Sequence, residues 1–179
     1  MTRLYQLSAC EMVTRLKSGD SSVYDALDSL QQRIQQTDSV INALPTLCFD
    51  RARQHADKIA ALAIEQRGML CGLPVTIKDL TPVAGVRTSF GSRVYENYIP
   101  EHSDRLVHQI EKCGGVIYAK SNTPEFGTGG ITFNDVFGIT RTPRNTDFAS
   151  GGSSGGAAAS LAAGSAWLSH GSDLSLIHI

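Results

Sequence analysis

Residues 71–80 read CGLPVTIKDL, an apolar stretch that ends in a lysine and an aspartate. Apolar and polar residues alternate after its Gly-Leu-Pro segment, which is typical of a β-strand. Further along, residues 103–113 (SDRLVHQIEKC) predict a short amphipathic helix capped by Ser103, and residues 114–120 (GGVIYAK) predict a buried strand. A strand, a helix and a second strand in this order indicate an α/β fold.

The part of the chain before this strand predicts helices. Residues 8–36 contain two of them, and Ser8 caps the first through a capping box with Glu11. The second helix has apolar residues at spacings of four, three and four, which places them on one side. Residues 50–66 predict a third helix, whose apolar side reaches Ala63. We expect these helices to pack on an apolar surface.

The composition indicates one folded domain. The chain has 179 residues, of which 41% are hydrophobic and 18% are charged, and its net charge is −1. This balance argues against a nucleic-acid or membrane partner. The first residues do not resemble a signal peptide, and no apolar run approaches the roughly twenty residues that cross a bilayer. Four scattered cysteines predict reduced, mostly buried thiols, so we expect a cytoplasmic protein.

Lys78 has two interpretations. A lysine beside apolar residues commonly extends its amine from a strand edge to solvent. A buried lysine can instead lose its proton near neutral pH and act as a base. Asp79 need not pair with Lys78, because neighbouring side chains of a strand point to opposite faces. None of the five histidines has the spacing of a ligand pair, so we expect no metal site.

Residues 151–156 (GGSSGG) also allow several interpretations. They end a stretch, 121–156, with little periodicity, which is either functional or disordered. A flexible linker is one possibility, although a helical pattern follows directly. A second possibility is an anion-binding loop, but the segment lacks the lysine of the nucleotide-binding motif. A third possibility is a nucleophile turn of the G-x-S-x-G type. This turn needs an acid and a histidine later in the chain, and only Asp173 and His178 follow, too close together to span a sheet.

Three segments taken together resemble the amidase signature family of Ser-Ser-Lys hydrolases. They are GLPVTIKDL at residues 72–80, AKSNTPEFGTGG with VFGITRTP within residues 119–143, and GGSSGGAAASLAAG at residues 151–164. The resemblance covers about residues 10–174. It implies an α/β fold of the layered α/β/α kind around a large, mixed, twisted sheet. Residues 1–174 would be the N-terminal portion of this single domain.

The resemblance also implies roles for individual residues. Lys78 matches the catalytic lysine of the family, and Ser153 matches the catalytic serine that follows a cis peptide bond. In the family scheme, the neutral lysine takes a proton from this serine, which in turn deprotonates the attacking serine. Ser154 matches a supporting hydroxyl of the same network. The loop that lines the substrate pocket in the family matches Thr128, Gly129 and Gly130.

The chain departs from the family pattern after Asp173. Residues 171–173 (GSD) match the opening of the nucleophile segment, but the expected Gly-Gly-Ser is replaced by SLI at residues 175–177. The attacking serine is therefore expected at the position of Ile177 and is missing, as are the backbone amides of the oxyanion hole. We expect this chain to be inactive. We also expect residues 175–179 to be an artefactual tail outside the family domain.

The function implied for the full-length parent is hydrolysis of carboxylic amides to an acid and ammonia or an amine. The substrate would be a small-molecule amide, with no cofactor and no metal, and a homodimer of the parent remains open. Two alternatives stay open. One is an enzyme like the A subunit of an amidotransferase, which uses ammonia with partner subunits. The other is a catalytically dead relative that acts as a binding module.

Overall fold

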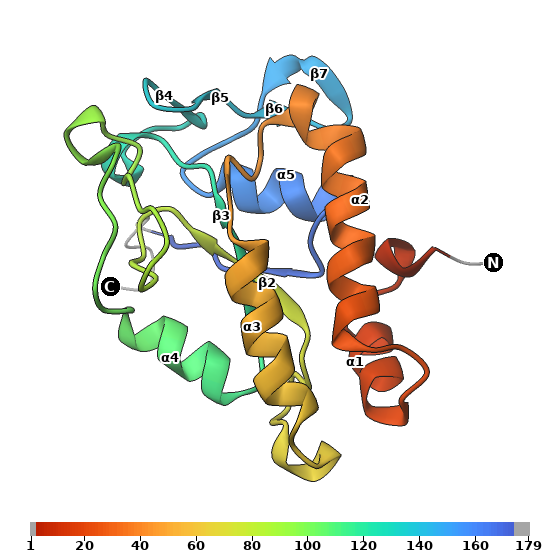
Figure 1. Ribbon diagram of the computed structural model, residues 1–179. Coiled ribbons are helices and arrows are strands. Elements are labelled where there is room, and N and C mark those ends of the chain that lie inside the picture. The colour runs from red at the N-terminus through yellow and green to blue at the C-terminus, as the bar shows by residue number, and fades with distance from the viewer. Residues whose placement is uncertain (1–2, 174–179) are drawn as a thin grey trace.

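The fold is built on a mixed four-stranded sheet, seen in the computed structural model, which describes residues 3–173. The strand order is β1-β3-β2-β8, and Figure 1 shows β2 and β3 at the centre of the molecule. β2 runs parallel to both β3 and β8, whereas β1 is antiparallel to β3. The strands are β1 (Thr46–Leu47), β2 (Pro74–Lys78), β3 (Val116–Ser121) and β8 (Leu168–Ser169). The predicted α/β class and mixed sheet are confirmed.

The two central strands are buried along their whole length, on both faces. The chain passes from β2 to β3 through a long loop and α4 (Arg105–Lys112), as the sequence predicts. The expected cap of this helix is wrong. Asp104 is the cap, and its carboxylate accepts a hydrogen bond from the Leu106 amide at 2.8 Å. The hydroxyl of Ser103 instead accepts the amide of Ala84 in the preceding loop.

The helices before the sheet follow the predicted pattern. After a 3-10 turn, η1 (Leu4–Gln6), helix α1 (Ala9–Ser18) begins at the predicted capping box of Ser8 and Glu11. Helix α2 (Val23–Ile41) begins at Ser22, whose hydroxyl accepts the Asp25 amide, and is longer than predicted. Its apolar residues at the predicted spacings are all buried.

Helix α3 (Phe49–Ala60) is shorter than the predicted helix over residues 50–66. Ala63 lies beyond its end and is exposed, and a separate turn, η2 (Ile64–Gln66), follows. The side chain of Arg67 donates hydrogen bonds to the carbonyls of Leu62 and Ala60. These bonds satisfy acceptors that a continuing helix would use internally, so the chain turns here.

Helices cover the sheet on both sides. One buried cluster joins α1, α2, α3 and α5 (Gly155–Ala163) to β3 and includes Leu27, Leu30 and Tyr118. A smaller cluster joins β2 and β3 to α4 and the β2–α4 loop. Figure 1 shows α4 and α2 on opposite sides of the central strands. This arrangement places the C-terminal end of β2 against the start of α5.

The stretch 121–156 is ordered and folds into turns and hairpins. It contains η4 (Glu125–Gly127), β4 (Phe133–Asn134), β5 (Gly138–Ile139), β6 (Arg141–Thr142) and β7 (Asn145–Ala149). Strands β4 and β5 pair with each other, as do β6 and β7. The side-chain amide of Asn42, at the end of α2, donates to the carbonyls of Phe137 and Ile139. The β4–β5 hairpin is therefore tied to the helical layer.

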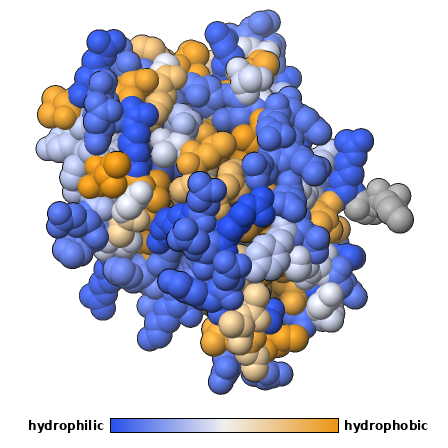
Figure 2. Space-filling model, in the orientation of Figure 1, coloured by the Kyte–Doolittle hydropathy of each residue, from blue (hydrophilic) through white to orange (hydrophobic). Residues whose placement is uncertain are grey.

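The surface is mostly polar on the face shown in Figure 2, with separate apolar patches. Within residues 3–173, no helix is long and apolar enough to cross a membrane.

All four cysteines are free thiols, but only Cys71 is buried and Cys10 is exposed. The expectation that the cysteines are mostly buried is therefore wrong. A further short turn, η3 (Arg93–Tyr95), lies in the loop between β2 and α4.

Candidate active site

Lys78 ends strand β2 and is fully buried, so the interpretation of an amine that reaches solvent is wrong. Its Nζ contacts three serine hydroxyls. The Oγ of Ser153 lies at 2.7 Å, that of Ser172 at 2.9 Å and that of Ser154 at 3.0 Å. The structure thus brings together the lysine and both serines of GGSSGG, and adds a third serine.

The surroundings of Lys78 favour its uncharged form. Burial lowers the pKa of the Lys78 amine, because the ammonium loses its hydration. Helix α5 begins at Gly155, directly after the two serines, and the positive end of its dipole acts in the same direction. An ammonium can donate to all three hydroxyls, and a neutral amine can donate to two and accept from the third. Either protonation state therefore keeps every contact.

The GGSSGG segment is held tightly and is not a flexible linker. A Cβ on Gly152 would lie 2.6 Å from the carbonyl oxygen of Gly129, and one on Gly156 would lie 2.3 Å from the amide nitrogen of Asn122. Only glycine allows such close approach of two backbones. The Gly152–Ser153 peptide bond is cis. The Thr123 hydroxyl donates to the carbonyl of Ser153 at 3.0 Å.

Ser154 and Ser172 bind each other through side chain and backbone. The Ser172 amide donates to the Ser154 hydroxyl, and the Ser154 hydroxyl donates to the Ser172 carbonyl, both at 3.1 Å. These contacts hold the segment after β8 against the start of α5. Sequence reasoning missed Ser172 as a partner of Lys78. The only signal for it in the sequence is its place in the GSD motif at residues 171–173, which matches the opening of the nucleophile segment.

The predicted substrate loop lies beside the serines. The Gly152 amide donates to the backbone carbonyl of Gly130 at 2.9 Å. In the same loop, the Thr128 amide donates to the backbone carbonyl of Glu125. A surface hollow of about 450 Å³ opens here. Its lining consists of Ser150, Gly151, Gly152, Ser153, Ser154, Ala158, Ser172 and Asp173. The expected nucleophile position, Ile177, lies outside the described residues.

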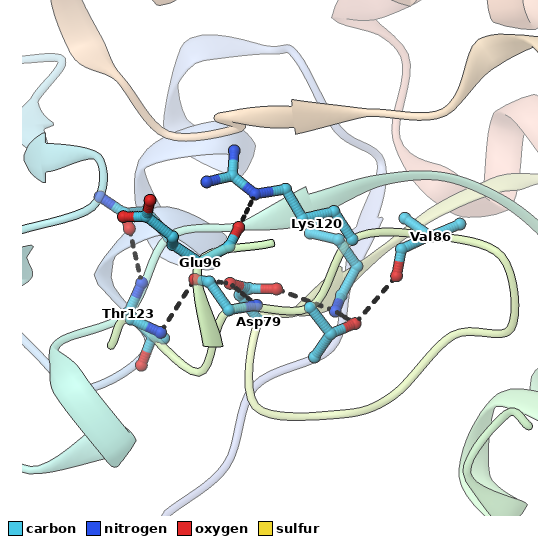
Figure 3. A network of polar contacts seen from close by, with 10 residues as sticks. Asp79, Val86, Glu96, Lys120 and Thr123 are labelled. Atoms are coloured by element: carbon cyan, nitrogen blue, oxygen red, sulfur yellow. Dashed lines mark hydrogen bonds and ion pairs between the residues drawn. The ribbon is translucent and has the colours of Figure 1, made fainter. Parts of the chain in front are cut away.

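Asp79, the residue directly after β2, does not bind Lys78, in agreement with the expectation that the two need not pair. Its carboxylate instead forms a buried ion pair with Lys120, with Oδ1 2.9 Å from Nζ. Figure 3 shows this pair within a polar network that extends to Val86. Sequence reasoning did not single out Lys120, because its strand was predicted only as a buried one.

Two alternative locations for an active site, a second hollow and a metal-binding cluster, can be compared with the cluster of Lys78 and the serines. A larger hollow, of about 580 Å³, lies between η1 and α2, but it is not lined by Lys78 or the serines. Among residues 3–173, no group of three or more His, Cys, Asp or Glu side chains is placed to hold a metal ion. The cluster of Lys78 and the serines is the better candidate, because it contains a buried amine next to potential proton donors.

Known proteins resemble this chain in sequence. A family model described as Amidase matches residues 25–175. The A subunit of the glutamyl-tRNA(Gln) amidotransferase of Synechococcus sp. (strain CC9605) is 40% identical over 161 residues, which cover 89% of this chain and 33% of that protein. The chain spans about a third of the length of the curated relatives that it matches.

Solved structures resemble it in fold. The 6-aminohexanoate cyclic dimer hydrolase, solved with its substrate, superposes with a TM-score of 0.85 at 27% identity, covering 95% of this chain and 34% of that one. The A subunit of the Thermotoga maritima glutamyl-tRNA(Gln) amidotransferase gives 0.74 at 28% identity, covering 91% and 33%. With a family match over most of its length, this chain belongs to the amidase signature family.

Proposed function

We propose that the full-length protein hydrolyses carboxylic amides, with Lys78 as the base and Ser153 as the proton bridge. One observation carries the proposal: the buried Nζ of Lys78 lies 2.7 Å from the Ser153 hydroxyl. This distance suits direct proton transfer. A buried amine whose pKa is lowered can be neutral, and therefore able to accept a proton, at a pH where an exposed lysine is charged.

The steps follow from this pair and from the family scheme. Lys78 takes the proton of Ser153, and Ser153 takes the proton of an attacking serine. That serine adds to the amide carbonyl, and the C–N bond breaks as the proton returns through Ser153 to the leaving nitrogen. Water then hydrolyses the acyl-enzyme by the same route. We propose that the full-length parent has the attacking serine at position 177, where this chain has isoleucine within the stretch 175–179 that is expected to lie outside the family domain.

Ser154 and Ser172 have supporting roles in this proposal. Each hydroxyl contacts Nζ of Lys78, and their mutual backbone contacts fix the distance between the start of α5 and the segment after β8. They keep the amine in place when it changes its protonation state. The loop from Thr128 to Gly130 is proposed to contribute to the substrate pocket, supported by the hydrogen bond from Gly152 to Gly130, although none of its three residues lines the hollow beside the serines.

A second candidate is an amidotransferase subunit that works with partner subunits. The names of similar proteins support this candidate. Eight curated relatives, 35–43% identical to this chain, are each called the A subunit of a glutamyl-tRNA(Gln) amidotransferase. The same amine and serines would then release ammonia from an amide donor for a partner to use. A cytoplasmic location and a homodimer stay predictions.

The test is hydrolysis of a panel of small amides by the full-length protein, with ammonia or amine release as the readout. Lys78→Ala and Ser153→Ala should each lower turnover by about 10²-fold or more, whereas Lys17→Ala, which changes an exposed lysine of α1, should not change it. Full turnover in either of the first two variants would refute the proposed roles. Amide cleavage that requires added partner subunits would favour the amidotransferase, and no cleavage in any setting would favour a binding module.

The 179-residue chain itself is proposed to be inactive, because Ile177 has no hydroxyl to attack a carbonyl. Its ammonia release should equal that of its own Lys78→Ala variant. Release above that level, lost in the variant, would show that another hydroxyl near Lys78 can attack. Ser172 would then be the first residue to substitute, given its contact with the amine.

A further inference from the structure

The end of strand β2 directs two consecutive charged side chains into different surroundings. Lys78 faces the serine hydroxyls of the candidate site, whereas Asp79 faces Lys120 and the β2–α4 loop. Both side chains of the Asp79–Lys120 pair are buried, with 1% and 0% of their surface exposed. A charge in such a place acts over longer distances than one in water, because little solvent screens it.

Further hydrogen bonds hold both members of the pair. Asp79 accepts one bond from Lys120 through Oδ1 and two from Ser89 through Oδ2, from the amide at 3.0 Å and the hydroxyl at 2.6 Å. Lys120 also donates to the Thr88 hydroxyl at 2.8 Å, and that hydroxyl donates to the carbonyl of Val86. Figure 3 shows how these contacts join β2, β3 and the loop. The carboxylate is therefore neutralised on the side away from the serines.

Other charges also lie around the amine of Lys78. His170 follows β8 and is half-buried, and burial lowers the pKa of its imidazole, as does the nearby Lys78. Asp173 lines the hollow beside Ser154. The titratable groups to consider, from β2, β3, the start of α4 and the segment after β8, are Asp79, Lys120, Asp104, His170 and Asp173. Among them, Asp79 is the one adjacent to Lys78 in sequence and deeply buried.

We propose that Lys120 is a positioning residue that acts on Lys78 through Asp79: it neutralises the buried carboxylate that follows Lys78 in the chain and thereby preserves the uncharged form of the Lys78 amine. This rests on the proposed function of Lys78 as a base. Without Lys120, the negative charge of Asp79 would favour the ammonium form of Lys78, which cannot accept a proton. The carboxylate would also keep its bonds to Ser89, so it would stay in place.

The experiment reads Lys78 directly and does not need turnover. The 179-residue chain is labelled with carbon-13 at the lysine ε-carbons, and the pH midpoint of the Lys78 signal is followed by NMR. Lys78→Met identifies the signal. Lys120→Gln, which keeps a hydrogen-bond donor but removes the charge, should raise the Lys78 midpoint by about one pH unit. The double variant, which carries both Lys120→Gln and Asp79→Asn and so has no charge at either position, should restore the original midpoint.

The two variants separate charge from structural damage. A misplaced strand would shift the midpoint in both variants, whereas the charge effect is reversed by the second substitution. An unchanged midpoint in folded Lys120→Gln, or a shift that persists in the double variant, would overturn the proposal. If Lys120→Gln does not fold, the Asp79→Asn variant tests the proposal instead. The pH midpoint of the Lys78 signal should be lower in this variant than in the unsubstituted chain, and an unchanged or higher midpoint overturns the proposal. Absence of amide hydrolysis by the full-length protein would refute only the proposed function.

Discussion

Two buried lysines occupy neighbouring strands and have opposite partners. Lys78 on β2 contacts only hydroxyls through its three hydrogen bonds, whereas Lys120 on β3 contacts a carboxylate and one hydroxyl. Burial lowers the pKa of both amines, but the charge and hydrogen bond of Asp79 act to raise that of Lys120. Burial therefore acts unopposed on Lys78 but is opposed by Asp79 at Lys120, which is the arrangement expected if Lys78 changes its protonation state and Lys120 keeps its charge.

The largest effect should come from Lys78→Arg in the full-length protein. Arginine keeps the positive charge and much of the length, but it does not lose its proton in proteins. If the neutral amine is the base, amide hydrolysis should fall by about 10³-fold or more, within the range of lost general-base catalysis. The rate of ammonia release measures this, with Lys17→Arg as the control. Retained hydrolysis would mean that Lys78 acts only through its charge.

Lys120→Met should affect stability more than Lys78→Met does. Removing Lys120 leaves the Asp79 carboxylate buried without its ionic partner, which typically costs about 3–5 kcal/mol. Removing Lys78 leaves hydroxyls, some of which can bond to each other or to water at the hollow, so about 1–2 kcal/mol is expected. Urea unfolding of the 179-residue chain compares the two. Equal losses would erase the proposed distinction between the lysines.

The two serines of GGSSGG should differ in importance. Ser153→Ala removes the proposed proton bridge and should lower amide hydrolysis by about 10²-fold or more. Ser154→Ala removes a contact to Lys78 while the Ser172 hydroxyl still holds the amine, so about a tenfold loss is expected. Steady-state rates of the full-length variants test the order. A larger loss for Ser154→Ala would exchange the roles of the two residues.

Thr88→Val should give the smallest effect. It keeps the size of the side chain but removes the hydroxyl that accepts from Lys120 and donates to Val86, which should lower the free energy of unfolding by about 1–2 kcal/mol. The carboxylate of Asp79 stays paired, so the Lys78 signal should not move. Urea unfolding and the NMR midpoint check both statements. A moved midpoint would mean that the loop, rather than the charge of Lys120, controls Lys78.

The sequence predicted the parts of this fold that depend on local chemistry. The capping box of Ser8 and Glu11 and the strand 114–120 follow from spacing and side-chain type alone, and the structure confirms them. The helix end at Ala60 could not be predicted this way, because it depends on Arg67 folding back onto carbonyls. The change from Ser103 to Asp104 as a cap likewise depends on a contact with a distant loop.

The candidate site was predictable only in part. Lys78 and Ser153 were singled out through a resemblance, and the structure places their reactive atoms within hydrogen-bond distance, although their catalytic roles stay predictions. Ser172 and Lys120 were missed, because each acquires its partner from a strand pairing that spacing does not reveal. The pairing of β2 with β8 brings Ser172 to Lys78, and that of β2 with β3 brings Lys120 to Asp79.

The proposed chemistry depends most directly on Lys78 being able to lose its proton in the folded chain. One NMR titration of the Lys78 ε-carbon, in the folded 179-residue chain and in the same chain unfolded in urea, measures this. Burial and the start of α5 predict a lower midpoint in the folded chain than in the unfolded one. An equal or higher midpoint in the folded chain would contradict the proposed role, because Lys78 would then be a permanent cation among the serines.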